Sequence, residues 1–170
     1  MAELTPKERL QPSLLDRLTD QEPEKREESR DKRVLSPAQL RRSVIRDLEW
    51  LLNTCDLASV QDLSNHPQTI DSVVNFGLPD LTGKHVSSLE VLSLERDLRR
   101  AILRFEPRIL RHSLRVRAVL DKAQVSHNAI RFDIEGELWG QPMPQPLYLK
   151  TEVDLETGAF EVSETAGVRG

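Results

Sequence analysis

The stretch "AILRFEPRILRHSLRVRAVL", residues 101–120, is where this chain changes from helical spacing to strand spacing. Pro107 lacks an N–H group and its ring clashes with the preceding turn, so a helix arriving from the N-terminal side must end near Phe105. Beyond the proline, apolar and polar residues alternate, and one face is formed by Leu114, Val116, Ala118 and Leu120. The stretch therefore predicts a helix that is followed directly by a β-sheet.

Two amphipathic helices are expected before this point. In the first, over residues 36–54, Ser36 and Gln39 have the spacing of a capping box, and Pro37 suits the first helical position. In the second, which ends near Phe105, Ser87 and Glu90 have the same capping-box spacing. The apolar stripes are Leu40, Val44, Leu48, Leu51, Leu52 and Cys55 in the first helix, and Val91, Leu94, Leu98, Ile102 and Phe105 in the second. Cys55 is therefore expected in the core, and residues 56–86 are expected to form an ordered loop.

Three further strands are predicted after the junction. "AIRFDIEGELW" at residues 129–139 and "PLYLKTEVDL" at residues 146–155 alternate in hydrophobicity, and "ETG" then turns the chain into a short strand. The inward residues would be Ile130, Phe132, Ile134, Leu138, Leu147, Leu149, Val153, Leu155, Phe160 and Val162. Helices followed by an antiparallel meander predict an α+β fold.

The N-terminal residues are expected to lie outside that fold. Residues 20–33 are almost all charged with mixed signs, which predicts a mobile linker within an extension over residues 1–33 and a single α+β domain over residues 34–170. Ahead of the linker, helical spacing is shared by Leu10, Leu14, Leu15 and Leu18. This short amphipathic segment could pack back on its own domain or dock on a partner, and the sequence leaves both interpretations open.

Composition narrows the classes of function. The 170 residues are 38% hydrophobic and 31% charged with a formal net charge of −4, and no apolar run is long enough to span a bilayer. Cys55 is the only cysteine, which is typical of a reducing compartment and favours a cytoplasmic location. The four histidines are scattered, and Gly77 and Gly83 lack the other residues of a phosphate loop, so we expect no metal and no cofactor.

Arginines are concentrated around the junction. They are Arg96, Arg99, Arg100, Arg104, Arg108, Arg111, Arg115 and Arg117. They could form a solvated helix face or a docking face for an acidic or phosphate-bearing partner, with nucleic acid the less favoured partner because aromatic residues are not interleaved. A glycosidase could use Glu106 with Asp80 or Glu90, but aromatic residues are only 4% of the chain and Arg108 favours an ionised Glu106.

Several motifs together resemble a known family. They are "PSLLDRL" at residues 12–18, "SVIRDLEWLLNT" at 43–54, "VVNFGLPDL" at 73–81, "LERDLRRAILRFEPRIL" at 94–110 and "LRVRAVL" at 114–120. In this order they resemble the TssE family of type VI secretion baseplate subunits, relatives of the small wedge protein of contractile phage baseplates. The most specific element is "FEPRI", and the family's "lysozyme-like" label is not supported by the residues here.

The resemblance implies a non-enzymatic baseplate adaptor. Glu106, Pro107 and Arg108 would contact the core bundle of TssF and TssG, with Arg104 and Arg111 beside them, and Pro107 would make Glu106 and Arg108 project in set directions. The sheet would resemble the interlocking domain of the sheath proteins TssB and TssC and start sheath polymerisation, through an edge at Phe160, Glu161 and Val162. Further expectations are N-terminal docking through Leu14, Leu15 and Leu18, TssK as an additional partner, and location at the inner-membrane-associated baseplate through partners. The alternatives are a peptidoglycan hydrolase and, less favoured, a nucleic-acid-binding adaptor.

Overall fold

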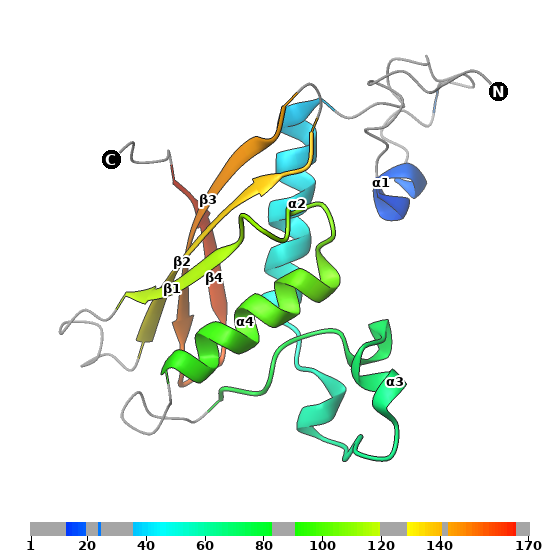
Figure 1. The fold of residues 1–170 in the computed structure, drawn as a ribbon, viewed down its shortest axis with the longest axis vertical. Helices are drawn as coiled ribbons and strands as arrows, with labels where there is room; N and C mark the ends of the chain where they lie inside the picture. Colours follow the sequence, from blue (N-terminus) through cyan, green and yellow to red (C-terminus); the bar gives the residue numbers. More distant parts are fainter. Residues whose placement is uncertain are drawn as a thin grey trace.

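The computed structural model describes residues 13–19, 24, 36–82, 91–119, 129–140 and 143–165. Two long helices and a four-stranded sheet form the body of the molecule, and short helical turns lie at one end (Figure 1). The helices are α1 (Leu14–Leu18), α2 (Pro37–Leu52), η3 (Leu57–Ser59), α3 (Pro67–Ile70), η4 (Val73–Asn75) and α4 (Val91–Phe105). The strands are β1 (Arg115–Val119), β2 (Ala129–Leu138), β3 (Gln145–Asp154) and β4 (Phe160–Glu164).

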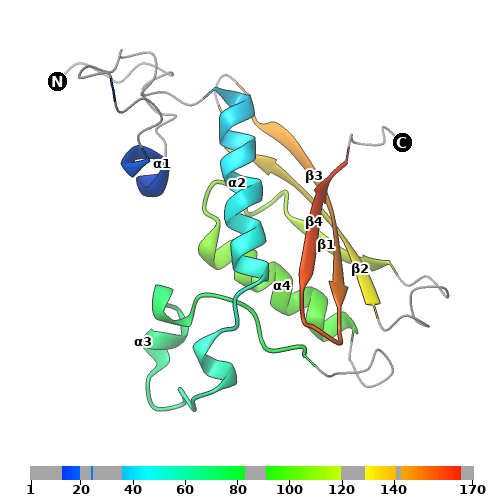
Figure 2. The same ribbon diagram turned by 180° about the vertical axis from the view of Figure 1, so that it is seen from behind.

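The four strands form an antiparallel meander in the order β1-β2-β3-β4. Burial alternates along β2 and β3, so one face of the sheet is covered and the other is solvated. The helices lie on the covered side, where α4 contacts β1, α2 contacts β4, and the two helices contact each other (Figure 2). The predicted α+β fold with an antiparallel meander is confirmed.

The ends of the long helices follow the sequence signals. At the start of α2, the Ser36 backbone N–H donates to Oε1 of Gln39 at 2.9 Å, and the Gln39 N–H donates to Oγ of Ser36 at 3.2 Å, so the first capping box is confirmed. Helix α4 ends at Phe105, two residues before Pro107, as predicted. The second capping box, Ser87 with Glu90, lies outside the described residues.

The core lies between the covered sheet face and the two long helices. Its fully buried side chains include Leu48, Leu51, Leu98, Ile102, Ile109, Phe132, Ile134, Leu138, Leu149 and Leu155. The predicted stripes supply most of these residues, but Cys55 is exposed, and its assignment to the core was wrong. Helix α2 ends at Leu52, so Cys55 lies beyond the last turn and no longer follows the helical stripe.

The "NFGLPDL" segment ties the loop after α2 back to the end of that helix. Gly77 has φ +131°, and a Cβ added there would lie 2.3 Å from the carbonyl oxygen of Thr54. The next residue, Leu78, donates its N–H to that same oxygen at 2.8 Å. The buried side chain of Asn75 accepts from the Ala58 N–H at 2.9 Å and donates to the Ile70 carbonyl at 3.1 Å. This segment is therefore ordered by internal contacts.

The N-terminal extension is described only in part. Helix α1 lies on the side of α2 that faces away from the sheet in both ribbon views (Figures 1 and 2). Leu10, Leu120 and, apart from Glu24, the linker at residues 20–33 lie outside the described residues. The division into an extension over 1–33 and a domain over 34–170 stays a prediction.

Candidate functional site

The segment after Pro107 is joined to the sheet at once. The Arg108 carbonyl accepts from the Trp139 N–H at 2.7 Å, and the Leu110 N–H donates to the Glu137 carbonyl at 2.8 Å. Ile109 thereby forms an isolated antiparallel bridge with Leu138 at the end of β2. Because the proline ends α4 and the next three residues pair with β2, the backbone of the "FEPRI" motif is held on both sides.

Glu106 and Arg108 bind each other across Pro107. The guanidinium Nε of Arg108 donates to Oε1 of Glu106 at 2.7 Å, and its Nη2 donates to Oε2. The Arg108 backbone N–H also donates to Oε1 at 3.1 Å. This two-pronged arrangement is the geometry in which arginine pairs most strongly with a carboxylate.

Helix α2 supplies the other side of this cluster, which we call the junction clamp: Ser43, Asp47, Glu106 and Arg108. Nη1 of Arg108 donates to Oγ of Ser43 at 3.1 Å, and its Nη2 donates to Oδ2 of Asp47 at 2.5 Å. Burial of Arg108 by itself lowers the pKa of its guanidinium, but hydrogen bonds and charge attraction from Glu106 and Asp47 raise that pKa above its ordinary value. The clamp joins the end of α4 to the middle of α2.

The side chain of Glu106 does not project outward as the sequence had suggested. Glu106 is only 3% exposed, and Arg108 turns its donors toward the clamp rather than toward solvent. Both carboxylate oxygens of Glu106 accept hydrogen bonds from Arg108, so neither is exposed in the way a catalytic proton donor would have to be. Pro107 itself is exposed, so the surface of the motif consists of the proline and part of Arg108.

Arg104 and Arg111 lie on either side of the motif and contact backbone carbonyls. Nη1 of Arg104 donates to the Ile70 carbonyl at 2.7 Å, and its guanidinium also pairs with Asp71. Arg111 is exposed and makes one long contact of 3.4 Å to the Leu103 carbonyl. Arg104 therefore holds the α3 turn against α4, whereas Arg111 remains available at the surface.

A groove of about 290 Å³ adjoins the junction clamp. The groove lies between α1, α2, the loop that follows α2 and the end of α4. Its lining residues are Ser13, Leu15, Asp47, Trp50, Leu51, Phe76, Phe105, Glu106 and Arg108. Phe76 and Phe105 meet edge to face, with ring centroids 5.1 Å apart. The lining is mostly apolar, and its polar groups are Ser13 and the residues of the junction clamp.

Helix α1 rests at the rim of this groove. Nη1 of Arg46 binds Oδ1 of Asp16 at 2.6 Å, and the same guanidinium lies 5.3 Å from the ring centroid of Trp50. Burial raises the pKa of Asp16, but hydrogen bonds from Arg46 and Ser13 and the charge of Arg46 outweigh it and lower that pKa below its ordinary value. Leu15 lines the groove but is still 41% exposed, and Leu14 and Leu18 are more exposed than Leu15.

The outer edge of β4 is the second candidate surface. Asn53, just after α2, donates from Nδ2 to the Phe160 carbonyl at 3.0 Å and accepts at Oδ1 from the Phe160 N–H at 2.9 Å. Both backbone groups of Phe160 therefore point away from β3. Because backbone direction alternates along an antiparallel strand, the groups of Val162 and Glu164 also point outward. Among the described residues, no partner is seen for them.

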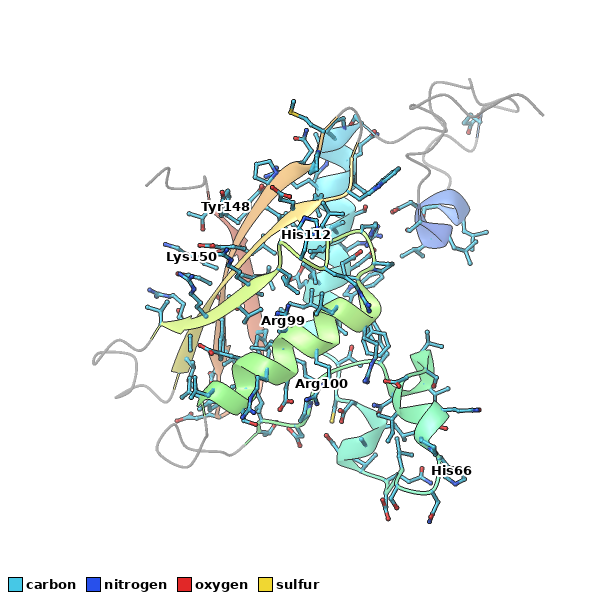
Figure 3. The ribbon with its side chains drawn as sticks, in the orientation of Figure 1. His66, Arg99, Arg100, His112, Tyr148 and Lys150 are labelled. Carbon is cyan, nitrogen blue, oxygen red and sulfur yellow. The ribbon has the colours of Figure 1, made fainter. Side chains whose placement is uncertain are left out.

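The opposite edge of the sheet is covered at two points by α4. The Ala118 N–H of β1 donates to Oε1 of Glu95 at 2.6 Å, and Nε of Arg99 donates to the Leu114 carbonyl at 3.4 Å. The predicted arginine run therefore divides, because Arg99 contacts the β1 edge while Arg100 pairs with Asp97 on α4 (Figure 3). Exposed Arg115 and Arg117 lie along β1 on the solvated face.

The site has no arrangement for metal chemistry within the described ranges, where no group of three or more His, Cys, Asp or Glu side chains could hold an ion. Figure 3 shows His66 in the α3 region and His112 near the junction, well apart. Glu90, one of the carboxylates weighed as a partner for Glu106, lies outside the described residues. Each described helix is too short or too polar to span a bilayer.

Sequence reasoning missed three residues that organise these surfaces: Ser43, Asp47 and Asn53. Ser43 and Asp47 are four residues apart, so they share one face of α2, and this polar pair beside an apolar stripe was the available signal. Asn53 follows the last helical residue, a position where asparagine is ordinarily explained as a helix cap. Its contact with Phe160 could not be inferred from spacing because 107 residues separate the two.

Comparison with known proteins gives one result. The model of the family described as baseplate wedge protein gp25 matches residues 38–143. No match was found among curated proteins or among solved structures. The matched region runs from the start of α2 to just before β3 and includes the whole junction clamp.

Proposed function

Because the chain belongs to the family of the baseplate wedge protein gp25, we propose that it is the TssE-type adaptor of a type VI secretion baseplate. Members of a baseplate wedge family work by contacting other baseplate components. In this proposal the chain links the wedge core made by TssF and TssG to the sheath made by TssB and TssC, and it starts sheath polymerisation. It acts in the cytoplasm at the baseplate, with TssK as a further candidate partner.

The observation that carries the proposal is the open edge of β4. Val162 and Glu164 direct their backbone groups outward, and a sheet edge of this kind can accept a strand from another protein. Phe160 is buried and its backbone is bonded to Asn53. The proposed sheath-facing edge therefore differs from the predicted Phe160, Glu161 and Val162: it excludes the backbone of Phe160 and is centred on Val162 and Glu164.

The wedge core would dock at the groove beside the junction clamp. The groove lining includes partly exposed Arg108, and exposed Pro107 precedes it in the chain at the end of α4. In this proposal Glu106 acts from inside, by orienting Arg108, and exposed Arg111 extends the contact. Helix α1 would add an N-terminal contact through its exposed Leu14 and Leu18.

Co-purification with TssF and TssG tests this surface. Trp50 lines the groove and is 51% exposed, so Trp50→Ala should preserve the fold and weaken co-purification by about tenfold or more, as expected for a central aromatic contact. Leu92→Ala, also at an exposed apolar residue but on the N-terminal part of α4, is the matched control and should bind as wild type. Equal binding by wild type and Trp50→Ala would contradict docking at the groove.

The hydrolase alternative is tested with purified peptidoglycan. Glu106 is buried and bonded through both oxygens to Arg108, so we expect no hydrolysis from the wild type and none from Glu106→Gln. Hydrolysis by the wild type that is lost in Glu106→Gln would overturn the proposed scaffold function. For the nucleic-acid alternative, we expect no salt-dependent DNA binding.

A further inference from the structure

The open face of the sheet carries rows of charged residues that run across the strands. One row consists of Arg117, Asp133, Lys150 and Ser163, taken from β1 to β4 by the strand register. Arg117, Asp133 and Lys150 alternate in sign, which is the favourable order for side chains that lie directly opposite each other. Figure 3 shows Lys150, with Tyr148, on the side of the sheet away from the helices.

The neighbouring row does not alternate. It consists of Val119, Arg131, Glu152 and Glu161, so that two carboxylates lie directly opposite each other on β3 and β4. Arg131 binds Glu152 at 3.2 Å from the β2 side. Glu161 is exposed at the edge, and within the described ranges no cation forms an ion pair with it. Like charges in directly opposed positions destabilise a sheet, so this row is unfavourable as it stands.

Asn53 determines where a strand added to β4 can begin to pair. Its amide occupies both backbone groups of Phe160, so the first available groups belong to Val162 and the next to Glu164. Helix α2 runs beside this edge, because Arg41 near its start binds Glu164 and Asn53 at its end binds Phe160. Pairing along this edge therefore begins at Val162 and excludes Phe160.

We infer that the β4 edge selects a protein strand that carries a lysine or arginine opposite Glu161, in a register determined by Asn53. The residue next to the one that pairs with Val162 would place its cation on the open face and extend the row with the missing positive charge. On the helix side, the added strand would meet half-buried Val162, so an aliphatic residue suits that position. This inference rests on the strand addition proposed above and specifies the chemistry of the strand.

The two edges of the sheet differ in which strand they would accept. At β1 the edge is bordered by exposed Arg115 and Arg117, and Glu95 and Arg99 already occupy backbone groups of this edge. A cationic strand would be repelled there and attracted at β4. Charge therefore directs the added strand to one side of the sheet.

Binding of the full chain to the TssB–TssC complex tests the inference. We expect Glu161→Gln to weaken binding about two- to fivefold and Glu161→Lys about tenfold or more, with a smaller salt dependence for Glu161→Gln than for wild type. Because the substitution also relieves repulsion with Glu152, Glu161→Lys should melt at or above the wild-type temperature. Weaker binding with undiminished stability is a combination that a merely structural role for Glu161 would not produce.

Two control variants separate this inference from the proposed function. Glu164→Pro removes an outward N–H, whereas Glu164→Ala keeps it and loses the same ion pair with Arg41. If Glu164→Pro loses binding and Glu161→Lys binds as wild type, the cation requirement is wrong and strand addition stands. If Glu164→Pro binds as well as Glu164→Ala, strand addition at this edge is wrong, and the inference is overturned with it.

Discussion

At the Pro107 junction the polar groups of Glu106 and Arg108 are satisfied inside the chain, whereas at the edge of β4 the backbone groups of Val162 and Glu164 point outward. The junction clamp joins α4, α2 and the start of the sheet, so it should contribute strongly to stability. At the β4 edge the Glu164 side chain pairs with Arg41 of α2, but within the described residues the outward backbone groups of Val162 and Glu164 have no partner, so this edge should contribute little to stability and remain free for association. Four predictions test this difference.

The largest effect is expected at the clamp. Arg108→Ala leaves Glu106 buried without its charge partner, and we expect the free energy of unfolding to fall by about 3 to 5 kcal/mol. Chemical denaturation of the purified chain measures it. Arg111→Ala is the matched control, because that arginine is exposed and should change stability by less than about 0.5 kcal/mol. Similar free energies of unfolding for Arg108→Ala and Arg111→Ala would contradict a stabilising role of the junction clamp.

The next effect distinguishes the two directions of the β4 backbone. The N–H of Glu161 points toward β3, where Glu161 is paired with Glu152, so Glu161→Pro should cost about 1 to 3 kcal/mol of stability. The N–H of Glu164 points outward, so Glu164→Pro should differ from Glu164→Ala by less than about 1 kcal/mol. Thermal melts of the three variants check this order. Glu164→Pro is therefore the variant that tests strand addition during sheath assembly in cells, because Glu161→Pro would also destabilise the fold.

A smaller effect is expected at Phe160, whose backbone groups are bonded to Asn53 and which precedes the outward backbone groups of Val162 and Glu164. Asn53→Ala removes the side chain that occupies both backbone groups of Phe160, and we expect a loss of about 1 to 2 kcal/mol. Hydrogen exchange at the Phe160 amide should become faster, while exchange at Leu149 in β3 should change less. Unchanged exchange at Phe160 would mean that Asn53 does not cap the edge.

The smallest effect concerns α1. The folded-state pKa of Asp16 lies below its ordinary value of 3.8, so its pair with Arg46 stabilises α1 docking above about pH 4. This contribution is lost as pH falls through the lowered pKa, and it is below about 1 kcal/mol because Arg46 is partly exposed. Trp50 fluorescence, recorded from about pH 5 to about pH 2 so that it brackets the ordinary pKa of aspartate, should show this transition. In Asp16→Asn that transition should be absent.

The sequence by itself determined the order and type of the two long helices and the four strands, but not the short helices η3, α3 and η4, which lie where a loop was predicted. Pro107 ended α4, alternation identified the strands, and the Ser36 capping box marked the start of α2, because each of these signals depends on residues close together in the chain. The "FEPRI" motif also identified the family by resemblance, which the family match confirmed. The partner roles assigned to individual residues stay predictions.

Only the tertiary structure decided which polar groups find a hydrogen-bond partner within the described residues and which point outward without one. Arg108 meets Asp47 across 61 positions and Asn53 meets Phe160 across 107, and no periodic pattern specifies contacts at such separations. Local spacing describes which face of an element is apolar, but the partner of a polar side chain depends on how the helices pack on the sheet. For that reason the sequence identified the motif and the final strand, while packing turned Glu106 inward and left Val162 and Glu164 at the edge.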